Sequence, residues 1–142
     1  MKSWRRWGRA LALPLGVVLA TPAVAATVVV GAGQNLSDAV RAAKPGDVIA
    51  IHRAQYQTNL LIDKPLTLRG SDRPTLSGGN QGDTIRVTAP DVLIEGLIVR
   101  DSGSNLGDQN AGIYLYPGAH RAIVRNCELT YNLFGLWVEK AD

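Results

Sequence analysis

Ala111-Gly-Ile-Tyr-Leu-Tyr116 and Phe134-Gly-Leu-Trp-Val-Glu139 both place a glycine before apolar residues at alternate positions. The two copies lie 23 residues apart, measured from Ile113 to Leu136. Alternation with a period of two is typical of a strand that buries one face. Two earlier segments have the same pattern, Gly46-Asp-Val-Ile-Ala-Ile51 and Gly82-Asp-Thr-Ile-Arg-Val87. Short strands that recur in this way predict an all-β solenoid, specifically a parallel β-helix.

Two further sets of apolar segments complete the coils. The second set comprises residues 64–70, 90–96 and 120–126, and the third comprises residues 97–99 and 127–129. We expect Gly70, Gly96 and Asn126 to share one turn position, because Gly and Asn both tolerate positive φ. We expect three inward faces, made of Ile49/Ile51, Ile85/Val87, Ile113/Leu115 and Leu136/Val138; of Leu66/Leu68, Val92/Ile94 and Ala122/Val124; and of Leu97/Val99 and Cys127/Leu129.

The spacing between copies is not constant. Ile85 and Ile113 are 28 residues apart, because a polar loop at residues 101–110 lengthens that coil. Ile49 and Ile85 are 36 residues apart, which predicts an insertion in the first coil around residues 56–61 or 75–81. The coil pattern itself is shared by pectate-lyase-like and carbohydrate-binding β-helices.

A helix is predicted ahead of the coils, at Asn35-Leu-Ser-Asp-Ala-Val-Arg-Ala-Ala43, with Asn35 or Ser37 as its N-cap. An amphipathic helix in this place would cover the open end of the solenoid. The sequence stops at Asp142, directly after a strand, and no equivalent cover is visible there. We therefore expect the chain to be an N-terminal fragment of a longer protein. Its parts are a signal peptide (1–25), an N-terminal strand and capping helix (26–45) and β-helix coils (46–142).

The N-terminus has the layout of a secretory signal peptide. Four basic residues and no acid lie in residues 1–9, an uncharged run follows at 10–20, and Ala23-Val24-Ala25 is a cleavage pattern. The uncharged run would span only about 16 Å as a helix, too short for a transmembrane segment. We expect a periplasmic protein. Arg5-Arg6 leaves twin-arginine export open beside the general secretory route.

Charge and cysteine content exclude several classes of protein. Cleavage after Ala25 would change the net charge from +3 to −1, and no cluster of Lys and Arg would remain to bind nucleic acid. Cys127 is the only cysteine, so the chain has neither an internal disulfide nor a four-cysteine zinc site. We interpret Cys127 as a small core residue, and we do not expect His52 and His120 to share a metal.

Two groups of residues are candidate binding sites. The loop 101–110 is polar and glycine-rich, and it could bind Ca²⁺, a sugar or a partner, or be a solvated insertion. Its candidates are Asp101, Asn105, Asp108 and Asn110. The outward residues of the first face form a predicted column of Ala50, Arg86, Tyr114 and Trp137.

The Arg-Tyr-Trp part of this column could stack on sugar rings or anchor a protein partner, or it could pack as a ladder along the coils. No group of carboxylates is specific enough to predict a reaction, so we expect no catalytic residues and no metal or cofactor site in this chain.

Four runs carry a resemblance to a known family: Ile85-Arg-Val-Thr-Ala-Pro-Asp-Val, Glu95-Gly-Leu-Ile-Val-Arg-Asp-Ser-Gly103, Ala111-Gly-Ile-Tyr-Leu115 and Asn132-Leu-Phe-Gly-Leu-Trp-Val-Glu139. They resemble the NosD family of periplasmic maturation proteins for nitrous oxide reductase. The upstream runs Lys44-Pro-Gly-Asp47 and Asp63-Lys-Pro-Leu-Thr-Leu-Arg-Gly70 match it too.

The resemblance implies a right-handed β-helix that docks on the membrane subunits of an ABC transporter. It implies work with a copper chaperone and with nitrous oxide reductase during copper-site assembly, and it implies no catalytic residues. Copper(I) favours Cys, Met and His, which are scarce after residue 25, so we expect copper to be handled elsewhere in that system. The alternative is a secreted carbohydrate-active β-helix enzyme or sugar-binding module.

Overall fold

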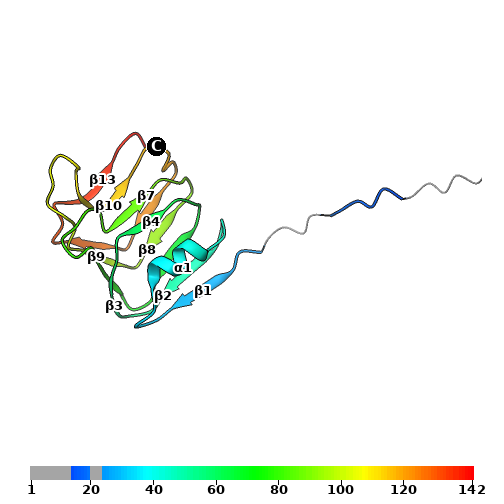
Figure 1. The fold of residues 1–142 in the computed structure, drawn as a ribbon, viewed down its shortest axis with the longest axis horizontal. Coiled ribbons are helices and arrows are strands. Elements are labelled where there is room, and N and C mark those ends of the chain that lie inside the picture. Colours follow the sequence, from blue (N-terminus) through cyan, green and yellow to red (C-terminus); the bar gives the residue numbers. More distant parts are fainter. Residues whose placement is uncertain (1–13, 20–23) are drawn as a thin grey trace, which may run out of the picture.

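The structure is a computed structural model, and it describes residues 14–19 and 24–142. It confirms a right-handed parallel β-helix (Figure 1). Three parallel sheets run along the solenoid, and each coil contributes one strand to each sheet. Four coils of three strands follow strand β1, which with helix α1 begins a further turn, so that the chain makes about five turns.

Sheet A has five strands and sheets B and C have four each. Sheet A contains β1 (Thr27–Val30), β2 (Val48–Ile51), β5 (Thr67–Gly70), β8 (Leu93–Glu95) and β11 (Ile123–Arg125). Sheet B contains β3 (Gln55–Gln57), β6 (Thr75–Ser77), β9 (Ile98–Arg100) and β12 (Glu128–Thr130). Sheet C contains β4 (Leu60–Ile62), β7 (Ile85–Val87), β10 (Ala111–Leu115) and β13 (Phe134–Val138).

Most of the predicted stacking is confirmed. Leu68 aligns with Ile94 and Ile94 with Val124 in sheet A, and Val99 aligns with Leu129 in sheet B. In sheet C, Ile85, Ile113 and Leu136 form one column, beside a second of Val87, Leu115 and Val138. Like side chains stacked coil on coil bury one continuous apolar core, which is the main stabilising contribution in a solenoid.

The prediction for the first coil is wrong in one respect. Ile49 and Ile51 do not stack on β7, because β2 belongs to sheet A and pairs with β5. The partner of β7 is β4, where Leu60 and Ile62 are buried. The supposed insertions are the strands β3, β4 and β6, each of which buries alternate residues as the other strands do.

Helix α1 (Leu36–Ala42) and β1 begin the solenoid, as the capping prediction requires. The side chain of Asn35 accepts a hydrogen bond from Asp38 N at 3.1 Å, which is the predicted N-cap. Leu36 and Val40 are buried in the main core. Strand β1 pairs with β2 while α1 packs on β1 and β4, so both elements cover the open end of the first coil (Figure 1).

The shared turn position between sheets A and B is present, but only two of its residues have positive φ. Gly96 has φ of 73° and Asn126 has φ of 52°. Gly70 is needed for a different reason. A Cβ on Gly70 would lie 2.3 Å from the carbonyl oxygen of Gly96 in the next coil, so the backbones approach too closely for any side chain.

The fourth coil is more exposed than the coils before it. Leu136 and Val138 are 43% and 49% exposed, whereas Ile113 and Leu115, their partners in β10, are buried. Within the described residues, no helix is long and apolar enough to cross a membrane. The predicted signal peptide lies largely outside the described residues, so the structure does not test it.

Candidate functional site

The outer face of sheet C carries the column predicted from the sequence, with one correction. Register places Leu61, Arg86, Tyr114 and Trp137 side by side on β4, β7, β10 and β13. Ala50 is not in this column, because it pairs with Val29 and Arg69 in sheet A. The column therefore begins with an exposed leucine in place of an alanine.

Asp83 lies just before β7 and connects three elements of this face. Its side chain is only 1% exposed and faces Arg86, with 3.2 Å between Oδ2 and Nε. It also accepts hydrogen bonds from Ala111 N at 2.9 Å and from the hydroxyl of Tyr116 at 3.3 Å. Asp83 thus fixes the guanidinium of Arg86 beside the ring of Tyr116, 5.0 Å from the ring centroid.

Tyr114 is buried, at 2% exposed, which agrees with the alternative that this part of the column packs as a ladder along the coils. Its ring stacks on Tyr116 with 3.8 Å between centroids, and its hydroxyl donates to Glu139 Oε2 at 2.5 Å. Burial, with the hydrogen bond to Glu139 and the negative charge of Glu139, raises the pKa of Tyr114 to about 12. Burial and the charge of Asp83 also raise the pKa of Tyr116. Tyr114 is therefore a support for this face, and cannot stack on a ligand.

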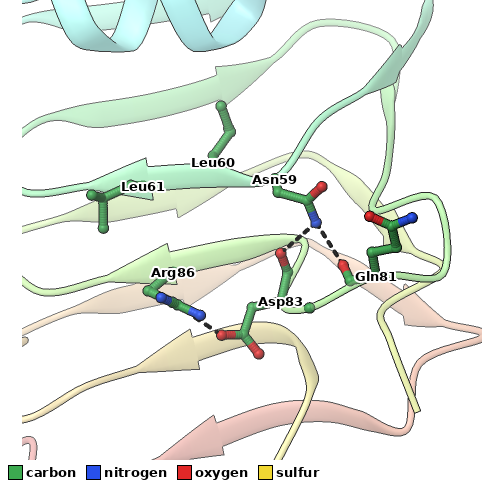
Figure 2. A pocket seen from close by; sticks show the side chains of 7 residues that line it. Asn59, Leu60, Leu61, Gln81, Asp83 and Arg86 are labelled. Carbon is green, nitrogen blue, oxygen red and sulfur yellow. Dashed lines mark hydrogen bonds and ion pairs between the residues drawn. The ribbon is translucent and has the colours of Figure 1, made fainter. Parts of the chain in front are cut away.

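A shallow depression of about 370 Å³ lies over β4 and β7 (Figure 2). Its apolar wall comes from Leu60 and Leu61, and its polar groups come from Asn59, Gln81, Asp83 and Arg86. Asn59 Nδ2 donates to the carbonyl oxygens of Gln81 and Asp83, at 2.7 and 2.9 Å. These bonds join Asn59 to the 78–83 turn, while the ion pair with Asp83 holds Arg86.

The loop 101–110 is ordered by its own side chains. Asn110 is buried and accepts from Asn105 N at 3.0 Å, while Asn105 Nδ2 donates to Asp108 at 2.7 Å. Asn105 also accepts from Gly107 N at 2.9 Å. Asn105 and Asn110 therefore shape the loop. Asp108 is exposed, and its charge contributes to the raised pKa of Tyr116.

The seven residues predicted as binding residues do not form a single site. Arg86, Tyr114 and Trp137 share the outer face of sheet C. Asp101 belongs to the sheet B side, where it forms an ion pair with Arg100 at 2.9 Å and accepts from Ser77 Oγ at 2.8 Å. Trp137 is half-buried and packs against Phe134, with 4.7 Å between ring centroids.

Three contributors to the sheet C face were not predicted: Asp83, Tyr116 and Glu139. Two of them could have been found by extending the period of two, because Tyr116 and Glu139 follow Tyr114 and Trp137 at the next outward position. Asp83 carries no such signal, since its position before a strand does not reveal that it reaches β10.

The described residues contain no group of three or more His, Cys, Asp or Glu side chains arranged to hold a metal ion. Cys127 is partly buried in the fourth coil against the main core, and burial raises the pKa of its thiol. This placement agrees with its interpretation as a core residue.

Comparison with known proteins gives two curated relatives, each named a probable ABC transporter binding protein NosD. The relative from Pseudomonas aeruginosa is 34% identical over 85 residues, and that from Stutzerimonas stutzeri is 31% identical over 85 residues. Each alignment covers 60% of this chain and 20% of the relative, so the chain spans about a fifth of the length of the relatives it matches. No family model and no solved structure matches the chain. The two relatives confirm the resemblance to the NosD family that the sequence predicted.

Proposed function

We propose that this chain is part of a periplasmic NosD-type accessory protein, without catalytic activity of its own, that associates with an ABC transporter. The observation that carries the proposal is its similarity to two proteins named as probable ABC transporter binding proteins. A β-helix suits such a role, because its flat sheet faces display side chains in fixed rows for a partner to bind.

The outer face of sheet C is the proposed docking surface. Tyr, Trp and Arg dominate the energetics of protein interfaces, and this face presents Arg86 and Trp137 beside the buried Tyr114 and the half-buried Tyr116. Arg86 is held by a buried carboxylate, so docking would cost little side-chain entropy. Exposed Leu61 beside Arg86 adds an apolar contact.

In the finer form of the proposal, the protein acts with a copper chaperone in the assembly of the copper sites of nitrous oxide reductase. Deletion of the gene tests this form. We expect the reductase purified from the deletion strain to be copper-deficient, and expression of the gene from a plasmid to restore its copper. A reductase with normal copper content in the deletion strain would refute the maturation role.

Docking is tested separately, by co-purification of the full-length protein with the transporter membrane subunits in detergent. We expect Arg86→Ala and Trp137→Ala to weaken co-purification at least tenfold, since central interface side chains each contribute about 2 kcal/mol or more. Arg125→Ala is the matched control, because Arg125 is also an exposed arginine with one ion pair but lies on sheet A. Equal losses for Arg86→Ala and Arg125→Ala would exclude sheet C as the docking surface.

A further inference from the structure

A polar groove crosses the outer face of sheet B. It consists of two adjacent depressions, of about 500 and 400 Å³, that share Gln55 and Thr75 in their walls. We call it the sheet B groove. Its lining residues, besides the two shared ones, are Tyr56, Gln57, Ser77, Arg100 and Asp101 in one part and Arg53, Ala54, Asp72, Arg73 and Ile98 in the other.

The floor of the groove is built from outward amide and hydroxyl side chains. Gln55 aligns with Thr75, and Gln57 with Ser77 and then Arg100, so these groups stand in rows across three coils. An amide and a hydroxyl can each donate and accept hydrogen bonds. Such a surface matches a ligand that also carries many groups able to do both.

Arg100 is positioned from two sides. Its guanidinium lies 4.7 Å from the ring centroid of Tyr131, and its Nε is 2.9 Å from Asp101 Oδ2. Asp101 in turn accepts from Ser77 Oγ at 2.8 Å. The buried Nε of Arg100 still makes no hydrogen bond within the described structure, because its direction toward Asp101 is poor.

The charges around the groove balance. Arg100 faces Asp101, and Arg73 pairs with Glu128 at 2.8 Å. Arg53 and Asp72 line the same end of the groove with opposite charges. A balanced site has no net attraction for a polyanion or a polycation, so the ligand is expected to be uncharged.

We propose that the sheet B groove binds a neutral oligosaccharide. Neighbouring sugar hydroxyls donate and accept at once, which matches the amides of Gln55 and Gln57 and the hydroxyl of Thr75. The ion pair of Arg100 and Asp101 adds a donor and an acceptor at one end. This site lies on a different sheet from the proposed docking surface and does not depend on the transporter role.

The test is native affinity electrophoresis of the full-length protein in gels that contain one soluble neutral polysaccharide each: xyloglucan, galactomannan, dextran or hydroxyethylcellulose. A gel with polygalacturonate tests for a charged ligand. We expect at least one neutral polymer to retard the protein. Arg100→Ala and Gln57→Ala should each weaken the retardation about tenfold, the effect of losing hydrogen bonds worth about 1.4 kcal/mol.

Arg69→Ala is the matched control, since Arg69 is also an exposed arginine paired with one carboxylate, Glu95, but lies on sheet A. It should bind as the wild type does. Thermal unfolding of each variant separates a lost site from a lost fold, and Gln57→Ala serves if Arg100→Ala does not fold. Retardation by none of the neutral polymers, retardation by polygalacturonate alone, or equal loss in Arg69→Ala would each overturn the proposal.

Discussion

Asp83 is the residue on which the outer face of sheet C depends. Its buried carboxylate accepts from Ala111 N, Tyr116 and Arg86 at once. We expect Asp83→Ala to lower the free energy of unfolding by about 3 kcal/mol, because it leaves a buried backbone donor and a guanidinium without their acceptor. Asp83→Asn should cost less, since its amide oxygen can still accept from Ala111. Urea unfolding of both variants measures the difference.

The control for this prediction is Asp108→Ala. Asp108 is exposed in the loop 101–110 and shares one side-chain hydrogen bond with Asn105. Its removal should change stability by no more than about 0.5 kcal/mol. If Asp83→Ala and Asp108→Ala lowered the free energy of unfolding equally, the effect would come from the loss of a negative charge, and the role assigned to Asp83 would be wrong.

Tyr114 makes the stability of the fold dependent on pH in the alkaline range. Its pKa is raised to about 12 in the folded chain, against about 10 in an unfolded one. The folded state therefore holds this proton more tightly, and the resulting stability is complete below pH 10 and is lost as the pH rises toward 12. Unfolding in urea at a series of pH values should show this decline, and Tyr114→Phe should show less of it.

Glu139→Gln separates the causes of that raised pKa. Burial is the largest cause and remains in the variant, while the charge of Glu139 disappears. The tyrosinate absorbance of Tyr114 should then appear at lower pH than in the wild type, but the pKa of Tyr114 should still lie above the ordinary pKa of tyrosine. An unchanged titration would mean that Glu139 does not contact Tyr114 in solution.

Among the elements, the strands with the clearest alternation were predicted and the weakest ones were not. β7, β10 and β13 each carry two large apolar residues around one outward residue. β3 and β6 have a single apolar residue between polar ones, Gln-Tyr-Gln and Thr-Leu-Ser. One apolar residue cannot define a period, so only the stacking of Tyr56 on Leu76 identifies these segments as strands.

Gly70 tests how closely the coils approach at the turn between sheets A and B. An added Cβ would lie 2.3 Å from Gly96 O and 2.8 Å from Pro74 Cδ. We expect Gly70→Ala to lower the free energy of unfolding by about 1–3 kcal/mol, because backbone atoms must move to admit it. Gly31→Ala is the control, since its nearest neighbour would be Gln34 Oε1 at 3.7 Å. Equal stability of the two variants would show that the turn can widen freely.

We predict that helix α1 stabilises the first coil against local unfolding. Leu36 is buried in the core, and the helix packs on β4. Leu36→Ala should lower the stability by about 2–4 kcal/mol, and amide exchange should become faster in β4 before it does in β8. Arg41→Ala, on the exposed side of the same helix, should leave exchange in β4 unchanged. Faster exchange in every strand to the same extent would show that α1 is not a local cap.

At the scale of the whole molecule, the solenoid and most of the sheet C column were predictable from the sequence, but the sheet B groove was not. Stacking needs only the repeat, which the sequence displays. A site such as the sheet B groove combines side chains from three coils, and the wrong assignment of β2 to the face of β7 hid the first of these coils. The sequence left open whether Tyr114 is exposed or packed, because its burial depends on Tyr116 and Glu139, from two coils, together.

Within the 142-residue chain, the fourth coil should be the least stable of the four. Val87 and Val138 occupy one column of sheet C, both aligned with Leu115, but Val87 is buried and Val138 is 49% exposed. The stabilisation from a valine scales with the apolar area it buries, so Val87→Ala should destabilise the chain about twice as much as Val138→Ala. In this chain, amides of β13 should also exchange about tenfold faster than those of β7, because opening the fourth coil uncovers less apolar surface. The prediction is wrong if both valine variants lose the same free energy of unfolding and the amides of β13 and β7 exchange at the same rate. The exposed side of β13 would then be covered in solution, and sedimentation should show that chains associate through this edge.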